Sequence, residues 1–407
     1  MSTATAPWTA TAEAAGLRRR VLITLCLTEI TSWGILYYAF PVLSVSIATD
    51  TGWSPSAIAG AFSLSQLAAA LTGIPVGRVL DRVGPRAVMT GGSVLAVPAL
   101  IMVALAPNAP VFYLGWLAAG VAMGAVLYPP AFAALTRWYG TGHVKALMIL
   151  TLAGGLASTV FAPVTAELAR HTDWRAAYLV LAAVLAIVTV PGHVFGLAGP
   201  WPPAPAPATA VEADHRGIVR SPAFLALIIS LSLGAFAAVA AVFNLVPLLI
   251  ERGFSPAFAA VTLGLGGVGQ VLGRIGYLPL VTHTGTRTRI VGTFAATAVA
   301  TALLGGATTA FALITVSMGA GLIRGIMTLV KATAVTDRWG ATHYGRLTGL
   351  MWAPIVIVTA LAPWAGTVLA TWTGSYARTY LLLAAIAAVS AVFALATSPR
   401  DPRPADG

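Results

Sequence analysis

The stretch Gly52-Trp53-Ser54-Pro55 decides the fold, because it returns about 200 residues later as Gly253-Phe254-Ser255-Pro256. In both copies the serine can cap a helix and the proline suits the first helical position, so each copy predicts the start of a helix. Other residues return at the same offset, which indicates two related halves. The pairs are Gly84 with Gly285, Arg86 with Arg287, Gly120 with Gly321, Gly124 with Gly325, Arg137-Trp138 with Arg338-Trp339, and Lys145 with Arg346.

The composition is that of a membrane protein. The chain has 407 residues, of which 58% are hydrophobic and 9% are charged, whereas soluble domains carry roughly 25% charged residues. Twelve apolar stretches are long enough to cross a bilayer, and in lipid only helices satisfy their own backbone. The expected fold is therefore all-α, with twelve transmembrane helices in two pseudo-symmetric six-helix bundles. The stretches are 21–47, 55–80, 87–106, 110–135, 146–169, 174–197, 222–250, 257–281, 290–310, 311–336, 346–371 and 376–397.

The net charge of +11 is spread over alternate loops and does not form one basic face, which excludes nucleic acid as a partner. Clusters such as Arg18-Arg19-Arg20 and Arg78 with Arg82 mark one side of the membrane, while the opposite loops hold few cations. By the positive-inside rule both termini lie in the cytoplasm, and the expected location is the cytoplasmic membrane. The membrane lipids are thus expected partners, and the chain is expected to function as a monomer.

A proline-rich break separates the halves at Pro200-Trp201-Pro202-Pro203 and beyond. Proline cannot continue a helix, so this segment reads as an extended linker. Two parallel membrane halves are typical of a secondary transporter whose site lies between them, near the bilayer midplane. The expected domains are a cytoplasmic tail 1–20, a bundle 21–197, a linker 198–221, a bundle 222–397 and a tail 398–407.

The loop after the second expected span reads Gly77-Arg78-Val79-Leu80-Asp81-Arg82-Val83-Gly84-Pro85-Arg86. It resembles the signature loop of the major facilitator superfamily, G-x-x-x-D-R-x-G-x-R, at the expected place. The resemblance implies a cytoplasmic latch, formed by Gly77, Asp81, Arg82, Gly84 and Arg86, that favours the outward-facing state. In the second half Thr282 stands where Asp81 stands in the first, so only the first copy is expected to latch. The alternative is a basic loop that only sets topology.

Three further stretches resemble the monocarboxylate transporters, with the oxalate/formate antiporters close by. They are Glu29-Ile30-Thr31-Ser32-Trp33-Gly34 followed by Phe40-Pro41, Arg137-Trp138-Tyr139 leading to Gly154-Gly155, and Gln270-Val271-Leu272-Gly273-Arg274. Two positions depart from the family pattern. Val42 stands where the animal carriers have a lysine, and Gln270 where they have an acidic residue. Proton-coupled lactate transport therefore does not simply carry over.

Apart from arginines within three residues of a span end, three lysines and arginines fall inside the expected spans, namely Arg274, Arg324 and Lys331. Because an intramembrane charge is costly, each is a functional candidate. Surplus positive charge suits an anion, and a guanidinium matches a carboxylate with two hydrogen bonds. Gln270 lies one turn before Arg274 on the same face. The expected substrate is a small organic anion, a monocarboxylate by resemblance. The alternative role for Arg324 and Lys331 is structural.

Glu29 is the carboxylate that lies well inside the expected spans, and it is the candidate for proton coupling; a fixed ion pair is the alternative. Tyr37, Tyr128 and Trp352 are candidate cavity walls, because rings with a polar tip suit a small amphipathic anion. No histidine has the spacing of a metal ligand and no phosphate loop occurs, so no metal, cofactor or ATP is expected.

Other functions fit the sequence less well. An exporter of drugs or secondary metabolites would have the same fold, but three intramembrane cations would suit apolar cations or neutral drugs poorly. A receptor would need a longer soluble part than Ser398–Gly407 provides. An enzyme is disfavoured because no catalytic constellation of His, Cys or Ser converges within the spans. The sequence leaves the anion and the direction of flux open.

Overall fold

The computed structural model describes residues 12–140, 143–201, 215–339 and 344–397, and these residues form helices and no strand. Twelve helical segments of the described residues are long and apolar enough to cross a membrane, and four of these segments join two or three consecutive helices. The predicted all-helical fold and the number of spans are therefore confirmed. The expected tail at 1–11, the linker residues 202–214 and the tail at 398–407 lie outside the described residues.

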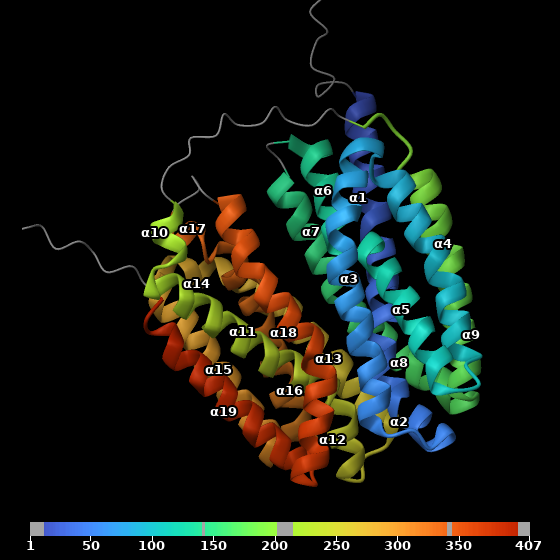
Figure 1. The fold of residues 1–407 in the computed structure, drawn as a ribbon, viewed down its shortest axis with the longest axis vertical. Coiled ribbons are helices and arrows are strands. Elements are labelled where there is room, and N and C mark those ends of the chain that lie inside the picture. Colours follow the sequence, from blue (N-terminus) through green and yellow to red (C-terminus); the bar gives the residue numbers. More distant parts are fainter. Residues whose placement is uncertain (1–11, 141–142, 202–214, 340–343, 398–407) are drawn as a thin grey trace, which may run out of the picture. The chain divides into compact units, whose positions relative to one another are not determined.

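The chain divides into two compact units. Unit 1 comprises Met1–Trp53 and Leu64–Ala206, and unit 2 comprises Ser54–Ser63 and Pro207–Gly407. In Figure 1, unit 1 has α4, α5 and α9 side by side, and unit 2 has α11, α15 and α19 side by side.

The helices up to the linker are α1 (Ala12–Trp33), the π-helix η2 (Gly34–Tyr38), α2 (Ala39–Thr51), α3 (Pro55–Val83), α4 (Pro85–Ala104), α5 (Ala109–Val126), α6 (Tyr128–Tyr139), α7 (His143–Gly155), α8 (Ala157–His171), α9 (Trp174–Pro191) and the π-helix η4 (Gly192–Gly196).

The helices after the linker follow the same order of spans. They are α10 (His215–Val219), α11 (Pro222–Phe243), α12 (Leu245–Glu251), α13 (Pro256–Ile275), α14 (Tyr277–His283), α15 (Thr286–Gly306), α16 (Ala310–Thr333), α17 (Thr336–Trp339), α18 (Tyr344–Thr373) and α19 (Tyr376–Ala394). α15 ends at Gly306 and α16 begins at Ala310, so the connection between the ninth and tenth spans is short, as the adjoining bounds 290–310 and 311–336 predict. Thr309 caps α16 by accepting a hydrogen bond from the Ala312 amide at 3.3 Å.

The repeated stretch that opens the sequence forms the same structure twice. Gly52 and Gly253 both have positive φ, at 69° and 85°, a conformation that glycine adopts without strain. Ser54 accepts a hydrogen bond from the Ala57 amide, and Ser255 accepts one from the Phe258 amide, each at 3.2 Å. The predicted helix caps are therefore confirmed in both halves.

Arginine side chains cap equivalent helix ends in the two units. Arg175 donates from Nη1 to the carbonyls of Ala104 and Ala106, at 2.9 and 3.0 Å, where α4 ends. Arg252 donates to Leu304 at 2.8 Å and also to Gly305 and Ala307, where α15 ends. Each guanidinium satisfies carbonyls that have no partner within their own helix.

The ninth span begins four residues earlier than the sequence pattern suggested. α15 starts at Thr286, so Arg289 lies inside the helix and not in a loop as expected. Its side chain is buried and forms an ion pair with Asp337 at 2.8 Å. Asp337 also accepts from Thr333 at 3.0 Å, and the Thr333 hydroxyl lies 3.0 Å from the phenol oxygen of Tyr277. The buried charge is tolerated because it is paired.

Candidate functional site

Glycines bring α13 and α16 into backbone contact in unit 2. A Cβ added at Gly269 would lie 2.0 Å from the Met318 carbonyl oxygen, and one at Gly273 would lie 2.0 Å from that of Leu322. On the facing helix, a Cβ at Gly325 would lie 2.1 Å from the Gln270 carbonyl oxygen. No larger residue fits this helix contact. It therefore fixes where Gln270 and Arg274 stand against α16.

Two cations of these helices act on one another. Arg274 and Gln270 are each 8% exposed, near the end of α13. The charge of Arg274 acts on Lys331 of α16, and Lys331 Nζ lies 5.4 Å from the ring centroid of Trp352 on α18. The buried Oε1 of Gln270 has no hydrogen-bond partner among the described residues. We call Arg274, Lys331, Gln270 and Trp352 the cationic centre.

The three helices that build the cationic centre supply no negative charge. The sequences of α13, α16 and α18 contain no aspartate and no glutamate. Two positive side chains that repel each other in an apolar bundle make the local electrostatic potential positive, because their charges are weakly screened there. The centre therefore has the charge, the hydrogen-bond donors and the aromatic wall that a small carboxylate requires.

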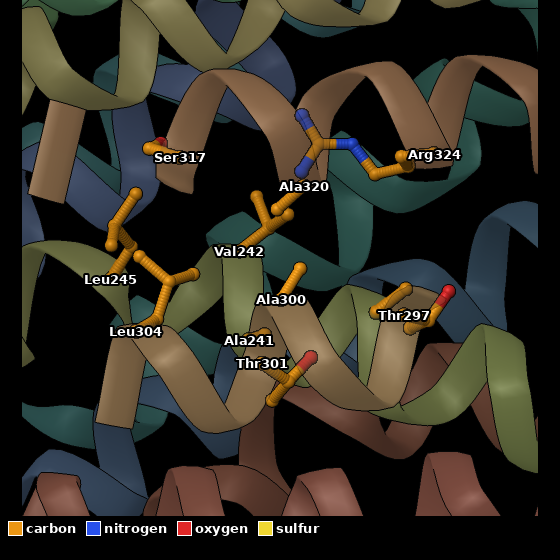
Figure 2. A pocket seen from close by; sticks show the side chains of 11 residues that line it. Ala241, Val242, Leu245, Thr297, Ala300, Thr301, Leu304, Ser317, Ala320 and Arg324 are labelled. Carbon is orange, nitrogen blue, oxygen red and sulfur yellow. The ribbon is translucent and has the colours of Figure 1, made fainter. Parts of the chain in front are cut away.

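Arg324 lies apart from the cationic centre. It lines a small cavity between α11, α15 and α16 together with Thr297, Thr301 and Ser317, and the remaining lining residues are apolar. In Figure 2 its guanidinium extends past Ala320 in the direction of Ser317. The Nη2 atom lies 3.9 Å from the position that a Cβ on Gly266 would take, two turns before Arg274 on α13. The structure thus brings together Arg274, Gln270, Lys331 and Trp352, but not Arg324.

An aromatic cluster in unit 1 contains the other two candidate wall residues. The ring of Trp33 lies 5.0 Å from those of Tyr37 and Tyr128, centroid to centroid, and Tyr128 stacks on Phe132 at 5.0 Å. The cluster forms where helices are interrupted. η2 follows Trp33 directly, and α6 begins at Tyr128 after the extended residue Leu127. Such π-helical turns are frequent at functional sites.

Glu29 is buried one turn before this cluster. The residue is 0% exposed, and both carboxylate oxygens lack a hydrogen bond of normal geometry among the described residues. The buried indole Nε1 of Trp33 also lacks a hydrogen bond of normal geometry. Its N–H is the polar group that interacts with the Glu29 carboxyl group. Because such groups are costly to bury without a partner, Glu29 and Trp33 stand out as candidate site residues.

The signature loop is only partly described. α3 continues to Val83, Gly84 has φ of 84°, and α4 begins at Pro85. Arg86 donates from Nε to the Val194 carbonyl of η4 at 2.8 Å, within unit 1. The Asp81 side chain lies outside the described residues, and the latch formed by Gly77, Asp81, Arg82, Gly84 and Arg86 stays a prediction.

Sequence reasoning missed three polar features. Trp33 was part of the quoted motif, and its spacing of four residues from Glu29 could have shown that both share a helix face. The Arg289–Asp337 pair was hidden by the misplaced start of α15. His193 is 0% exposed inside η4, and its Nδ1 lies 2.7 Å from the Ser93 hydroxyl, a contact that the sequence does not predict.

The chain matches the model of the Major Facilitator Superfamily over residues 25–330. It therefore belongs to this superfamily and is a multi-pass membrane transporter of that class. An uncharacterized MFS-type transporter of Bacillus subtilis, YcxA, is 31% identical over 147 residues, which are 35% of each protein. Monocarboxylate transporter 11 of Mus musculus is 28% identical over 230 residues, covering 56% of this chain and 50% of that protein. The chain thus spans half or less of the length of these curated relatives.

A solved structure shares the fold over nearly the whole chain. A bacterial homolog to the human lysosomal transporter Spinster, in an inward-facing and unoccupied conformation, has a TM-score of 0.72 and 15% identity. The match covers 94% of this chain and 97% of that chain. At this identity the likeness concerns the fold alone.

Proposed function

We propose that this chain is a secondary active transporter that moves a small organic anion, a monocarboxylate, across the membrane by alternating access. The observation that carries this proposal is the cationic centre, where Arg274 and Lys331 act on each other on helices without an acidic residue. The named similarity to a monocarboxylate transporter supports the same class of substrate.

The cationic centre offers a separate interaction for each part of such a substrate. The guanidinium of Arg274 can donate two parallel hydrogen bonds to a carboxylate. Lys331 adds a second positive charge, and Trp352 gives an apolar surface for a short carbon chain. The Gln270 Oε1 atom can accept a hydrogen bond from a hydroxyl group on the substrate. Contact between Arg324 and the substrate stays a prediction, because its cavity is separate.

Glu29 is the proposed proton carrier. It is fully buried beside Trp33, in the aromatic cluster that contains Tyr37 and Tyr128. A neutral carboxyl group is less costly than a carboxylate in such surroundings, so the group can gain and lose a proton as water reaches it. Tyr37 and Tyr128 are proposed to line the substrate path in unit 1.

The orientation is proposed from the charge pattern. Both termini are assigned to the cytoplasm and the chain to the cytoplasmic membrane, where it acts as a monomer.

The test is uptake into proteoliposomes of a panel of radiolabelled solutes, with and without a pH gradient. The panel contains formate, acetate, lactate, oxalate, a neutral drug and a lipophilic cation. Saturable uptake of one or more monocarboxylates supports the proposal. Uptake of the neutral drug or the cation, with none of the carboxylates, would favour an exporter and overturn it.

A further inference from the structure

We infer that unit 2 holds a second anion site, separate from the cationic centre, in which Arg324 binds one anion of halide size. The inference concerns inorganic halide and goes beyond the proposed carboxylate transport. It stands on the cavity, its charge, its hydrogen-bond donors and its distance from Arg274.

The cavity is small. Its volume is about 30 Å³, which exceeds the roughly 10–15 Å³ that one water molecule needs. Alanine residues form much of its wall, including Ala241 and Ala300 of neighbouring helices. A monatomic anion or two waters fill this space, which is small for a carboxylate with a carbon chain.

The charge of the cavity is positive. Arg324 is the charged residue among those that line it, and the other lining side chains are apolar or carry a hydroxyl group. In apolar surroundings the attraction between a guanidinium and an anion is much stronger than in water. The cavity therefore favours an anion over the two waters that would also fit.

The donors for an anion can be identified from the hydrogen bonds of the hydroxyl groups. The Thr297 hydroxyl donates its proton to the Thr293 carbonyl at 2.8 Å, and the Ser317 hydroxyl donates to the Thr262 carbonyl at 3.1 Å. Thr301 is 3% exposed, and its hydroxyl makes no hydrogen bond within the described part of the chain. The Thr301 hydroxyl therefore remains as a donor beside the Arg324 guanidinium, which carries five N–H groups.

The cavity and the cationic centre are distinct. Arg324 reaches the level of Gly266 on α13, whereas Arg274 is eight residues further along this helix. At 1.5 Å per residue the two levels are roughly 12 Å apart. On α16, Lys331 lies seven residues beyond Arg324, roughly 10 Å in the same direction. The Arg324 guanidinium therefore points along α16 away from Lys331 and from the level of the Arg274 backbone.

The experiment measures thermal unfolding of the purified full chain in nanodiscs, with sodium chloride or bromide compared with sodium gluconate at equal ionic strength. Gluconate is too large for the cavity. The unfolding midpoint of the wild type is expected to rise by roughly 2–4 °C in halide, because a ligand of the native state alone stabilises it. Arg324→Gln is expected to lose this rise.

A second pair of variants keeps the test decisive if Arg324→Gln does not fold. Thr301→Val removes a donor and is expected to reduce the rise by at least half. Thr293→Val is the matched control, because Thr293 lies on the same helix outside the cavity and donates to the Arg289 carbonyl. Equal midpoints in halide and gluconate for the wild type would overturn the inference. So would an unchanged rise in Arg324→Gln or, where that variant does not fold, an unchanged rise in Thr301→Val.

Diffraction from crystals grown in bromide locates the ion. An anomalous peak within hydrogen-bond distance of the Arg324 guanidinium supports the site, and water alone in the cavity contradicts it. Arg274→Ala distinguishes the two proposals, because it should abolish carboxylate uptake and keep the halide response. If uptake persists in Arg274→Ala, the proposed function fails whatever the halide does.

Discussion

Lys331 Nζ lies 5.4 Å from the ring centroid of Trp352, and the charge of Arg274 acts on the same lysine. The aromatic ring stabilises the ammonium group, while the guanidinium repels it. The helices that carry these residues contain no acidic residue that would offset the repulsion. A bound carboxylate relieves the repulsion, which is the physical reason for assigning substrate binding to this centre.

Replacing Lys331 by methionine should weaken substrate binding and leave transport measurable. Methionine keeps the apolar stem against Trp352 and removes one of the two charges. We expect the KM for the carboxylate to rise roughly tenfold, equivalent to about 1.4 kcal/mol, with a smaller effect on the maximal rate. Initial uptake rates over a range of substrate concentrations measure both. An unchanged KM would exclude Lys331 from the site and leave it a structural cation.

Replacing Gly273 by alanine should separate α13 from α16. Its Cβ would lie 2.0 Å from the Leu322 carbonyl oxygen, so a helix must move. We expect a loss of unfolding free energy of about 1–3 kcal/mol and a loss of uptake, because Arg274 is the next residue. Gly319→Ala is the control, since nothing lies within 4 Å of an added Cβ there. Equal thermal stability of both variants would show that the helix contact is not tight.

Replacing Glu29 by glutamine should separate accumulation from exchange. Glutamine has nearly the same shape and cannot take up or release a proton. We expect the variant to lose accumulation driven by a pH gradient and to keep exchange of labelled for unlabelled substrate. Glu167→Gln is the control, because Glu167 is exposed and pairs with Arg170 on α8. If Glu29→Gln accumulates substrate as the wild type does, the proton is carried elsewhere.

Replacing Asp337 by asparagine should destabilise unit 2. The change leaves the buried Arg289 without its ion pair, and Asp337 itself is partly exposed, with 26% of its side chain accessible. We expect a loss of about 1–3 kcal/mol, the cost of leaving a buried polar group without its partner. Denaturant unfolding of Asp337→Asn and of the double variant Arg289→Met/Asp337→Asn measures it. A double variant less stable than the single one would contradict this explanation.

The sequence was sufficient for the twelve spans and the repeated helix starts, because length, hydropathy and the Ser-Pro pairs are local signals. It did not reveal η2, since a π-helical turn leaves the apolar pattern of the first span unchanged. The sequence pattern places the start of the ninth span too late, because an arginine at position 289 indicates a loop. Only the structure shows that Asp337 pairs with it. Arg324 was grouped with Arg274 because sequence distance along a helix does not give the direction of a long side chain. That direction depends on how α11, α15 and α16 pack.

Uptake by Arg274 variants tests the central claim most directly. Wild type, Arg274→Ala and Arg274→Lys are compared in proteoliposomes at equal protein content, with Arg378→Ala as a control on an exposed arginine of the same unit. We expect Arg274→Ala to abolish monocarboxylate uptake, Arg274→Lys to retain a small fraction with a raised KM, and Arg378→Ala to match the wild type. Monocarboxylate uptake by Arg274→Ala at the wild-type rate would contradict the central claim.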